Sequence, residues 1–217
     1  MKIIPLRVIA LDFDGTLVES NQIKDRAFET IFNKWPNHKQ EMMSWHYSND
    51  FIDRREKFKY FVEKVLKLND RDDLIEQLSK KFQELTRSTI IECPYVEGVE
   101  NFLDYISHRY TVYLVSATPQ LELEYIIRAK NLKVYFKNIY GAPINKLKIL
   151  RNIISKEKLS SNEILYIGDS PKDQQCAKDL DIIFFGRQSN RVLQESSHYI
   201  FKDFNEIYSH LKKYYEV

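Results

Sequence analysis

The sequence predicts an α/β protein that is built on a parallel sheet and carries a helical insertion. Short β-branched and aromatic runs alternate with amphipathic segments over most of the chain, which is typical of strands joined by helices. Between residues 18 and 92, in contrast, no convincing strand occurs. With 217 residues, of which 43% are hydrophobic, the chain can form a large buried core.

Five strand-like runs are expected to form the sheet. They are RVIALD (7–12), TVYLVSA (111–117), NIYGA (138–142), EILYIGD (163–169) and DIIFFG (181–186). The segment after the third run has the helical spacing that alternates with them, because Leu147, Leu150 and Ile154 lie on one face of a helix. This alternation favours a parallel sheet over an antiparallel one.

The strand-free region is interpreted as an inserted, all-helical domain. Its clearest helical stretches, 54–68 and 71–85, are rich in Lys, Glu, Phe and Leu. ECPYVEGV (92–99) then returns the chain to the sheet. We therefore predict an α/β core domain of residues 1–17 and 93–217 and a helical domain of residues 18–92.

Composition argues against several kinds of partner. The 33 Lys and Arg residues nearly balance the 31 Asp and Glu residues and form no dense run, so no nucleic-acid or membrane partner is expected. No apolar run reaches the roughly 18 residues of a membrane span, and Arg7 interrupts the apolar start, so no export signal is expected. Cys93 and Cys176 are far apart in the sequence. They are interpreted as reduced, buried thiols of a cytoplasmic protein.

The first candidate site is the end of the first strand, at DFDGT. Asp12 ends the strand, Phe13 points to the opposite face, and Asp14 returns to the face of Asp12. Gly15 allows a backbone turn that a Cβ atom would hinder. Two neighbouring carboxylates are costly unless a cation or a proton is shared between them. The pattern therefore indicates a ligand site at the carboxyl ends of the strands.

Two more segments place polar groups at the same edge. Ser116 ends an apolar run, and Thr118 and Pro119 are typical of the N-cap and first residue of a helix. Lys146 opens a predicted helix, where the positive end of the helix dipole disfavours a lysine unless an anion is near. Lys148 is the alternative for this lysine.

The last segment joins a strand end to a helix start. Asp169 ends an apolar run and has little reason to lie there unless it binds something. Ser170 and Pro171 are typical of an N-cap and a first helical residue, and Asp173 falls in the first turn.

These four elements, in this order, resemble the motifs of the haloacid dehalogenase-like (HAD) phosphohydrolases. DFDGTL (12–17) is similar to the first motif and GDSPKD (168–173) to the fourth. The common Gly-Lys-Pro form is absent, and the spacing after Lys146 resembles the variant in which the lysine directly opens the helix. The insertion at 18–92 resembles, by its position, the C1 cap of the phosphoglycolate phosphatase and β-phosphoglucomutase type.

The resemblance implies a Rossmann-like, doubly wound sheet of strand order 3-2-1-4-5, in which Asp12 and Asp169 face one another. It implies that Mg²⁺ is held by the side chains of Asp12 and Asp169 and the backbone carbonyl of Asp14. Asp12 would be the nucleophile and Asp14 the general acid and base.

The same resemblance implies a phosphate site and an activity. Ser116, the backbone amide of Ala117 and Lys146 would bind the phosphoryl group, with Asp173 as a supporting residue. The implied enzyme is a Mg²⁺-dependent phosphatase that acts on a small phosphorylated metabolite through an aspartyl-phosphate intermediate. It would be a monomer or a homodimer.

Alternatives remain open within the same fold. A sugar phosphomutase would use the same core, and a phosphonate hydrolase would need a cap lysine that forms a Schiff base. Two further alternatives are disfavoured because Asp14 is present. A non-catalytic binding protein would have no need of this acid, and halide displacement does not need it either. The substrate itself is not predicted.

No cap residue is assigned a function. Arg54 and Arg55 could hold an anionic group of a substrate, but a solvated helix face is the favoured interpretation. The aromatic residues Trp35, Trp45 and Tyr47 are interpreted as core residues.

Overall fold

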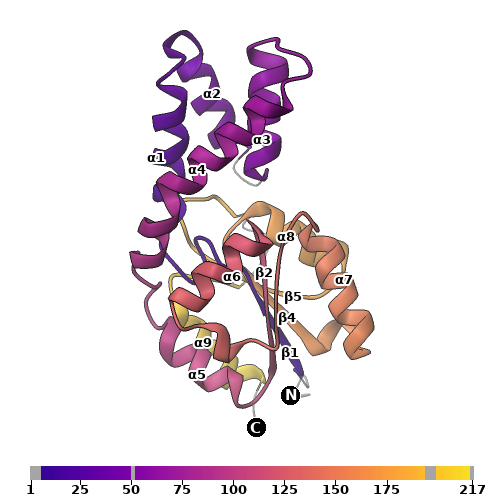
Figure 1. Cartoon of the computed structure of the whole chain (residues 1–217). Helices are drawn as coiled ribbons and strands as arrows, with labels where there is room; N and C mark the ends of the chain where they lie inside the picture. Colours follow the sequence, from indigo (N-terminus) through magenta and orange to yellow (C-terminus); the bar gives the residue numbers. More distant parts are fainter. Residues whose placement is uncertain (1–5, 50–51, 194–198, 216–217) are drawn as a thin grey trace. The chain divides into compact units, whose positions relative to one another are not determined.

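Figure 1 shows the computed structural model, which describes residues 6–49, 52–193 and 199–215. Its backbone contacts divide the chain into two compact units. The α/β unit comprises Met1–Glu19 and Cys93–Val217, and the helical unit comprises Ser20–Glu92. Among the described residues, no helix has the length and apolar character needed to cross a membrane.

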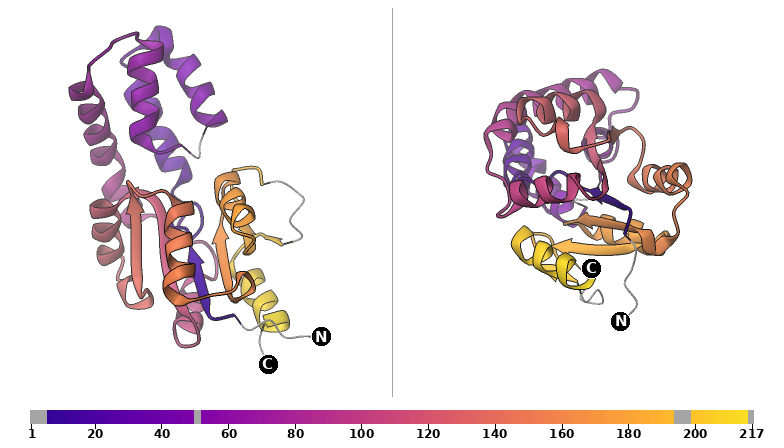
Figure 2. Two further views of the ribbon diagram at one scale, coloured as in Figure 1. Left: turned by 90° about the vertical axis from the view of Figure 1, so that its right-hand side faces the viewer. Right: turned by 90° about the horizontal axis from the view of Figure 1, so that it is seen from below.

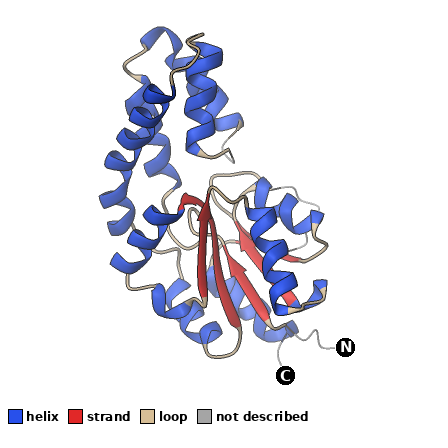
Figure 3. Ribbon diagram, turned by 45° about the vertical axis from the view of Figure 1, so that its right-hand side comes forward, coloured by secondary structure: helices blue, strands red, loops and turns tan. Residues whose placement is uncertain are grey.

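The α/β unit contains a six-stranded sheet in which every strand pair is parallel (red in Figure 3). The order β3-β2-β1-β4-β5-β6 confirms the predicted parallel sheet and the order 3-2-1-4-5. The strands are β1 (Val8–Leu11), β2 (Thr111–Pro119), β3 (Asn138–Ala142), β4 (Ile164–Gly168), β5 (Ile183–Arg187) and β6 (Ile200–Phe201). The sequence did not predict β6, because a two-residue edge strand has too few residues to show a pattern.

Strand β1 lies in the centre of the sheet and is buried along its whole length. It pairs with β2 on one side and β4 on the other, so that Leu11 lies opposite Leu114 and Ile167. The N–H of the next residue, Asp12, donates to the Ile167 carbonyl at 2.9 Å. The strand order changes direction between β1 and β4, and ligands of such sheets bind outside the carboxyl ends of the strands at this point.

Helices flank both faces of this sheet (Figure 2). Leu150 of α7 and Ala177 of α8 belong to one buried cluster with Val8 of β1, and the rings of Phe102 in α5 and Phe204 in α9 lie 4.9 Å apart. Burial on both faces explains why the strands are continuously apolar. The helices are α5 (Val99–Ser107), α6 (Gln120–Ala129), α7 (Lys146–Glu157), α8 (Pro171–Asp179) and α9 (Phe204–Tyr215), with 3₁₀ turns η2 (Lys133–Tyr135) and η3 (Ser161–Glu163).

The described part of the helical unit contains helices and no strand. Its elements are α1 (Asn21–Phe32), α2 (Pro36–Ser48), α3 (Arg54–Tyr60), the π-helical turn η1 (Phe61–Val65) and α4 (Asp72–Glu92). Aromatic rings dominate its interior, where Phe28 lies 5.4 Å from Phe58 and 4.6 Å from Phe82 between ring centroids. The unit therefore has a hydrophobic core of its own.

One helix of this unit differs from the prediction. The sequence predicts a single helix over 54–68, whereas the α-helix ends at Tyr60 and a π-helical turn, Phe61–Val65, follows it. Within that turn Phe61, Val62 and Val65 are all buried. The wider π-helical turn allows apolar residues at this spacing to face the same core, which a prediction based on regular α-helical spacing does not anticipate.

The cap residues considered from the sequence have structural surroundings of their own. Trp35 packs edge-on against Phe61, and Trp45 stacks on Tyr60 with ring centroids 4.0 Å apart. Arg55 forms ion pairs with the exposed side chains Glu76 and Asp72. Tyr47 is 59% exposed, so it is not the core residue that the sequence suggested.

Candidate active site

The carboxyl ends of β1, β2 and β4 carry most of the predicted site residues, and all of these lie in the α/β unit. Asp12 follows the last residue of β1, and Asp14 lies two residues further along a tight turn. Gly15 adopts a left-handed backbone conformation with φ of 73°, and its N–H donates to the Val18 carbonyl at 2.9 Å. Both carboxylates are buried, so neither is an ordinary solvated turn residue.

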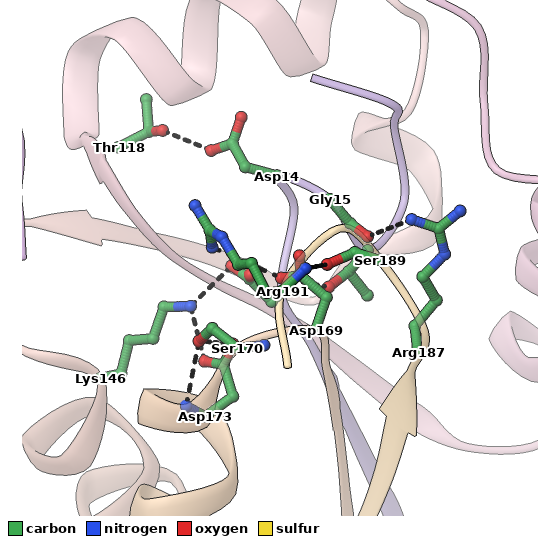
Figure 4. Close-up of polar contacts among 12 residues, drawn as sticks. Asp14, Gly15, Thr118, Lys146, Asp169, Ser170, Asp173, Arg187, Ser189 and Arg191 are labelled. Carbon is green, nitrogen blue, oxygen red and sulfur yellow. Dashed lines mark hydrogen bonds and ion pairs between the residues drawn. The ribbon is translucent and has the colours of Figure 1, made fainter. Parts of the chain in front are cut away.

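Lys146, the first residue of α7, brings two of these elements together. Its Nζ lies 2.8 Å from Oδ1 of Asp12 and 2.7 Å from Oδ1 of Asp173 (Figure 4). Burial alone would lower the pKa of Lys146, but the two carboxylates outweigh that effect and raise this pKa. Lys148, the alternative lysine, is exposed, and Lys146 is the lysine that lies beside the carboxylates.

Asp173 is held by hydrogen bonds from three directions. Ser170 caps α8 as expected, and its hydroxyl and N–H donate to Oδ2 of Asp173 at 2.5 and 3.2 Å. The Tyr166 hydroxyl donates to Oδ1 at 2.5 Å. Burial disfavours the ionised form of Asp173, but Lys146 and these hydrogen bonds outweigh it and lower the pKa of Asp173. These contacts therefore favour the ionised form of the carboxylate.

Gly168 is needed for this arrangement. A Cβ atom at this position would lie 2.6 Å from the Cβ of Asp173, closer than two non-bonded carbon atoms can approach. The glycine that ends β4 therefore lets the first turn of α8 pack directly against the strand.

Asp14 is paired with Thr118, a contact that the sequence did not predict. The Thr118 hydroxyl donates to Oδ2 of Asp14 at 2.8 Å, and the Thr118 N–H donates to Oγ of Ser116 at 3.0 Å. The prediction that Thr118 is a helix N-cap was wrong, because β2 continues to Pro119 and α6 begins at Gln120. Ala117 lies between these two buried residues with its side chain exposed.

The reason for the longer strand lies in a side chain of α6. Oε1 of Gln120 accepts from the Gly141 N–H at 2.5 Å, and Nε2 donates to the Ile139 carbonyl at 3.0 Å. These bonds to β3 keep the end of β2 extended and leave the Thr118 hydroxyl available to Asp14 rather than to a helix end.

Asp169 is fully buried after β4 and faces two residues that the sequence analysis did not single out for the site. Oγ1 of Thr16 lies 3.5 Å from Oδ1 of Asp169, and Nη1 of Arg191 lies 3.8 Å from the same oxygen. Thr16 belongs to the DFDGT segment, so its position in the sequence was a signal that could have identified it. Arg191 carries no local pattern, and its only signal is that it follows a predicted strand.

The three carboxylates Asp12, Asp169 and Asp173 form a buried acidic cluster, with one oxygen of each within 4.8 Å of the others. Burial, together with the charges of Asp173 and Asp169, raises the pKa of Asp12 to about 7, although Lys146 opposes the shift. An all-oxygen donor set suits a hard divalent cation such as Mg²⁺. Because Asp173 already accepts hydrogen bonds on both oxygens, Asp12 and Asp169 are better placed to hold such a cation.

Solved structures from several bacteria share this fold. A haloacid dehalogenase-like hydrolase from Streptococcus pneumoniae aligns over 95% of this chain and 99% of its own, with a TM-score of 0.71 and 17% identity. A predicted phosphoglycolate phosphatase from Haemophilus somnus aligns over 95% and 98%, with a TM-score of 0.73 and 18% identity. CbbY from Rhodobacter sphaeroides, in complex with xylulose-(1,5)bisphosphate, aligns over 93% and 96%, with a TM-score of 0.72 and 14% identity.

Comparison of sequences gives the family. No curated protein matches the chain significantly. The model of the haloacid dehalogenase-like hydrolases, however, matches residues 9–186, which include both aspartates of DFDGT, Lys146 and the acidic start of α8. The chain therefore belongs to the haloacid dehalogenase-like hydrolases.

Proposed function

We propose that this protein is a phosphatase that hydrolyses small phosphomonoesters with a divalent cation, for which Mg²⁺ is the best candidate. The observation that carries the proposal is the placement of the Asp12 carboxylate, 2.8 Å from the Lys146 ammonium at the carboxyl end of the central strand. A buried carboxylate next to a largely buried cation suits a nucleophile that must approach an anionic phosphoryl group.

The side chains of Asp12 and Asp169 would hold the cation, with the backbone carbonyl of Asp14 as the further ligand that the family resemblance implies. The raised pKa of Asp12 supports this assignment, since buried carboxylates that repel one another gain stability when positive charge is added. When bound, the cation would neutralise the charge of the phosphoryl oxygens and of the two carboxylates.

Asp12 would act as the nucleophile in the first step. One of its carboxylate oxygens attacks phosphorus, the bond from phosphorus to the substrate oxygen breaks, and an aspartyl-phosphate forms. The departing oxygen takes a proton from the carboxyl group of Asp14. In the second step water attacks phosphorus, Asp14 takes a proton from that water, and Asp12 is released with inorganic phosphate.

Thr118 would orient the acid in both steps. Its hydroxyl donates to Oδ2 of Asp14, which would orient the carboxyl group at the carboxyl ends of the strands. Proton transfer needs such positioning within hydrogen-bonding reach of the reacting oxygen. Thr118 is thus a positioning residue for Asp14 in this scheme.

Lys146, the Ser116 hydroxyl and the Ala117 amide would bind the phosphoryl oxygens. Lys146 is held between Asp12 and Asp173, so its ammonium group needs little reorganisation when the substrate arrives. Asp173 would serve catalysis indirectly, because it positions Lys146.

Two similar structures guide the choice of substrates. One is named a predicted phosphoglycolate phosphatase, and the other contains a sugar bisphosphate. Small phosphorylated acids and sugar phosphates are therefore the first compounds to test on this protein.

The test is release of inorganic phosphate from a panel of phosphoglycolate, sugar phosphates and nucleoside monophosphates, with Mg²⁺ or with EDTA. We expect metal-dependent release by the wild-type protein and by Arg151→Gln, a substitution at an exposed position of α7. Release by Asp12→Asn at the wild-type rate would contradict the role of Asp12. Formation of a sugar phosphate isomer in place of phosphate would instead identify a phosphomutase.

A further inference from the structure

Arg191 places a second cationic side chain at the acidic cluster. It lies beyond the end of β5, where its N–H donates to Oγ of Ser189 at 3.0 Å. Its guanidinium is directed toward the strand ends (Figure 4), and Nη1 lies 3.8 Å from Oδ1 of Asp169. The side chain is 17% exposed, so the charge is largely removed from bulk water.

The charges around this edge are unbalanced. Lys146 and Arg191 lie beside three buried acidic residues, Asp12, Asp169 and Asp173. A divalent cation would more than balance their charge, and the dianionic phosphate of a substrate would then make the site anionic again. The site therefore needs positive charge for the phosphate in addition to the cation.

The basic side chains of this edge differ in the length of their contacts with acidic groups. Lys146 contacts two carboxylates at 2.8 Å or less, and Arg187 donates to the Gly15 carbonyl and pairs with Glu19. The Arg191 contact with Asp169, at 3.8 Å, is longer than a hydrogen bond. A cation bound to Asp169 would compete with that contact directly.

The distance also suits an anion. Two oxygens that share one Mg²⁺ lie at most about 4 Å apart, since each lies about 2 Å from the ion. A phosphoryl oxygen that shared a cation with Asp169 would therefore lie no more than about 8 Å from Nη1 of Arg191, a separation that a long arginine side chain can close by changing rotamer. The fork of donors on arginine matches a phosphate better than any other side chain does.

We propose that Arg191, which lies beside Asp169, is a substrate-binding residue that binds the phosphoryl group of the substrate when a divalent cation occupies Asp169. This inference rests on the proposed phosphatase function and adds a second cationic residue to its phosphate site. It gives Arg191 opposite effects on two ligands. Arg191 weakens cation binding, because it competes for Asp169, and strengthens phosphate binding.

Calorimetry on the full chain tests both effects without turnover. Inorganic phosphate is titrated in saturating Mg²⁺, and Mg²⁺ is titrated alone, into wild type, Arg191→Gln, Arg191→Lys and the control Arg151→Gln. For Arg191→Gln we expect phosphate binding weakened about tenfold or more, the loss of a charge-assisted hydrogen bond. Mg²⁺ binding is expected to be unchanged or tighter, and Arg191→Lys is expected to fall between.

Three results would overturn the inference. Phosphate affinity of Arg191→Gln equal to wild type would show that the guanidinium is only a counter-ion of Asp169. Equal weakening of the binding of both ligands would indicate a purely structural role. Weakened phosphate binding in Arg151→Gln would show a non-specific charge effect.

The failure of the inference and that of the proposed function are distinguishable. Wild-type protein that hydrolyses phosphomonoesters, while Arg191→Gln binds phosphate normally, refutes the inference alone. Wild-type protein that hydrolyses none of the panel, while Arg191→Gln still loses phosphate affinity, refutes the proposed function alone.

Discussion

Two carboxylates on either side of Lys146 behave in opposite ways. Asp12 at the end of β1 and Asp173 in the first turn of α8 are both buried, and both lie within 2.8 Å of the same ammonium. Yet the pKa of Asp173 is lowered, whereas that of Asp12 is raised to about 7.

The difference comes from the hydrogen bonds around each group. Asp173 accepts from Ser170 and Tyr166 in addition to Lys146, and these donors compensate for the loss of water. Asp12 is fully buried and lies near two further carboxylates, Asp173 and Asp169, so its ionised form is destabilised until positive charge is added. Asp173, whose hydrogen bonds are made within the fold, positions Lys146, whereas Asp12 gains stability when a cation binds.

The largest effect is expected on catalysis from Asp12→Asn. An amide of the same shape cannot form the aspartyl-phosphate, so turnover should fall by at least about 10⁴-fold, as for other removed nucleophiles. The measurement is phosphate release at saturating Mg²⁺, with circular dichroism to show that the fold is kept. A loss below tenfold would mean that another group attacks phosphorus.

The next effect is on stability, from Asp173→Asn. The substitution leaves Lys146 with one carboxylate instead of two and removes an ionised acceptor from three donors. We expect the free energy of unfolding to fall by about 3 kcal/mol, near the value for breaking a buried ion pair. Urea denaturation measures it, with Asp179→Asn, an exposed residue at the end of the same helix, as the control. Equal effects of the two substitutions would contradict the framework role.

Local sequence was enough to predict the residues on both sides of Lys146. Asp12 and Asp169 interrupt apolar runs where a strand ends, and Ser170 and Asp173 form a helix start that depends on neighbouring residues only. Such signals need no knowledge of distant contacts. The parallel sheet was predictable for the same reason, because strands and helices alternate along the chain.

Two contacts that cross the fold, those of Thr118 and Arg191, were not predictable. Thr118 reaches Asp14 from 104 residues away, and a Thr-Pro pair is compatible with either a helix cap or a strand end. Arg191 approaches Asp169 only because β5 places its following loop at the same edge. Pairing of this kind depends on tertiary packing, about which the spacing of residues in the sequence carries no information.

A pH dependence sharpens the contrast on the side of Asp12. Because the folded protein raises the pKa of Asp12 from 3.8 to about 7, ionisation of this group costs folding free energy. Without metal, the contribution of Asp12 to the free energy of unfolding is largest below pH 4. This contribution is lost as the pH rises toward 7. Asp12→Asn avoids the cost, so relative to wild type it should gain roughly 2 kcal/mol between pH 5 and pH 8 in EDTA.

The measurement is urea denaturation of both proteins at the two pH values, repeated with Mg²⁺. Added Mg²⁺ should stabilise the wild-type protein at pH 8 and remove the advantage of the variant. A stability difference that stays constant from pH 5 to pH 8 would mean that Asp12 ionises normally in the fold, and the contrast with Asp173 would disappear.

The smallest effect concerns a single hydrogen bond on the side of Asp173. Tyr166 is fully buried in β4, its hydroxyl donates to Oδ1 of Asp173, and its ring packs 6.1 Å from that of Phe184. Tyr166→Phe keeps the ring and removes the donor, so the free energy of unfolding should fall by about 1.5 kcal/mol, the lower end of the range for a bond to a charged acceptor, because Ser170 and Lys146 still contact the carboxylate.

Tyr113→Phe is the matched control, because Tyr113 lies in the same sheet and donates to a carboxylate, that of Glu157, outside the acidic cluster. Lys137 also pairs with Glu157, so the loss of stability in Tyr113→Phe should stay below about 1 kcal/mol.

The rate of catalysis distinguishes the two tyrosines more sharply. If Asp173 is satisfied redundantly, Tyr166→Phe should keep the wild-type rate within about threefold, since Ser170 and Lys146 still hold the carboxylate. A rate loss as large as that of Asp173→Asn would show instead that the tyrosine hydroxyl itself keeps Lys146 in place.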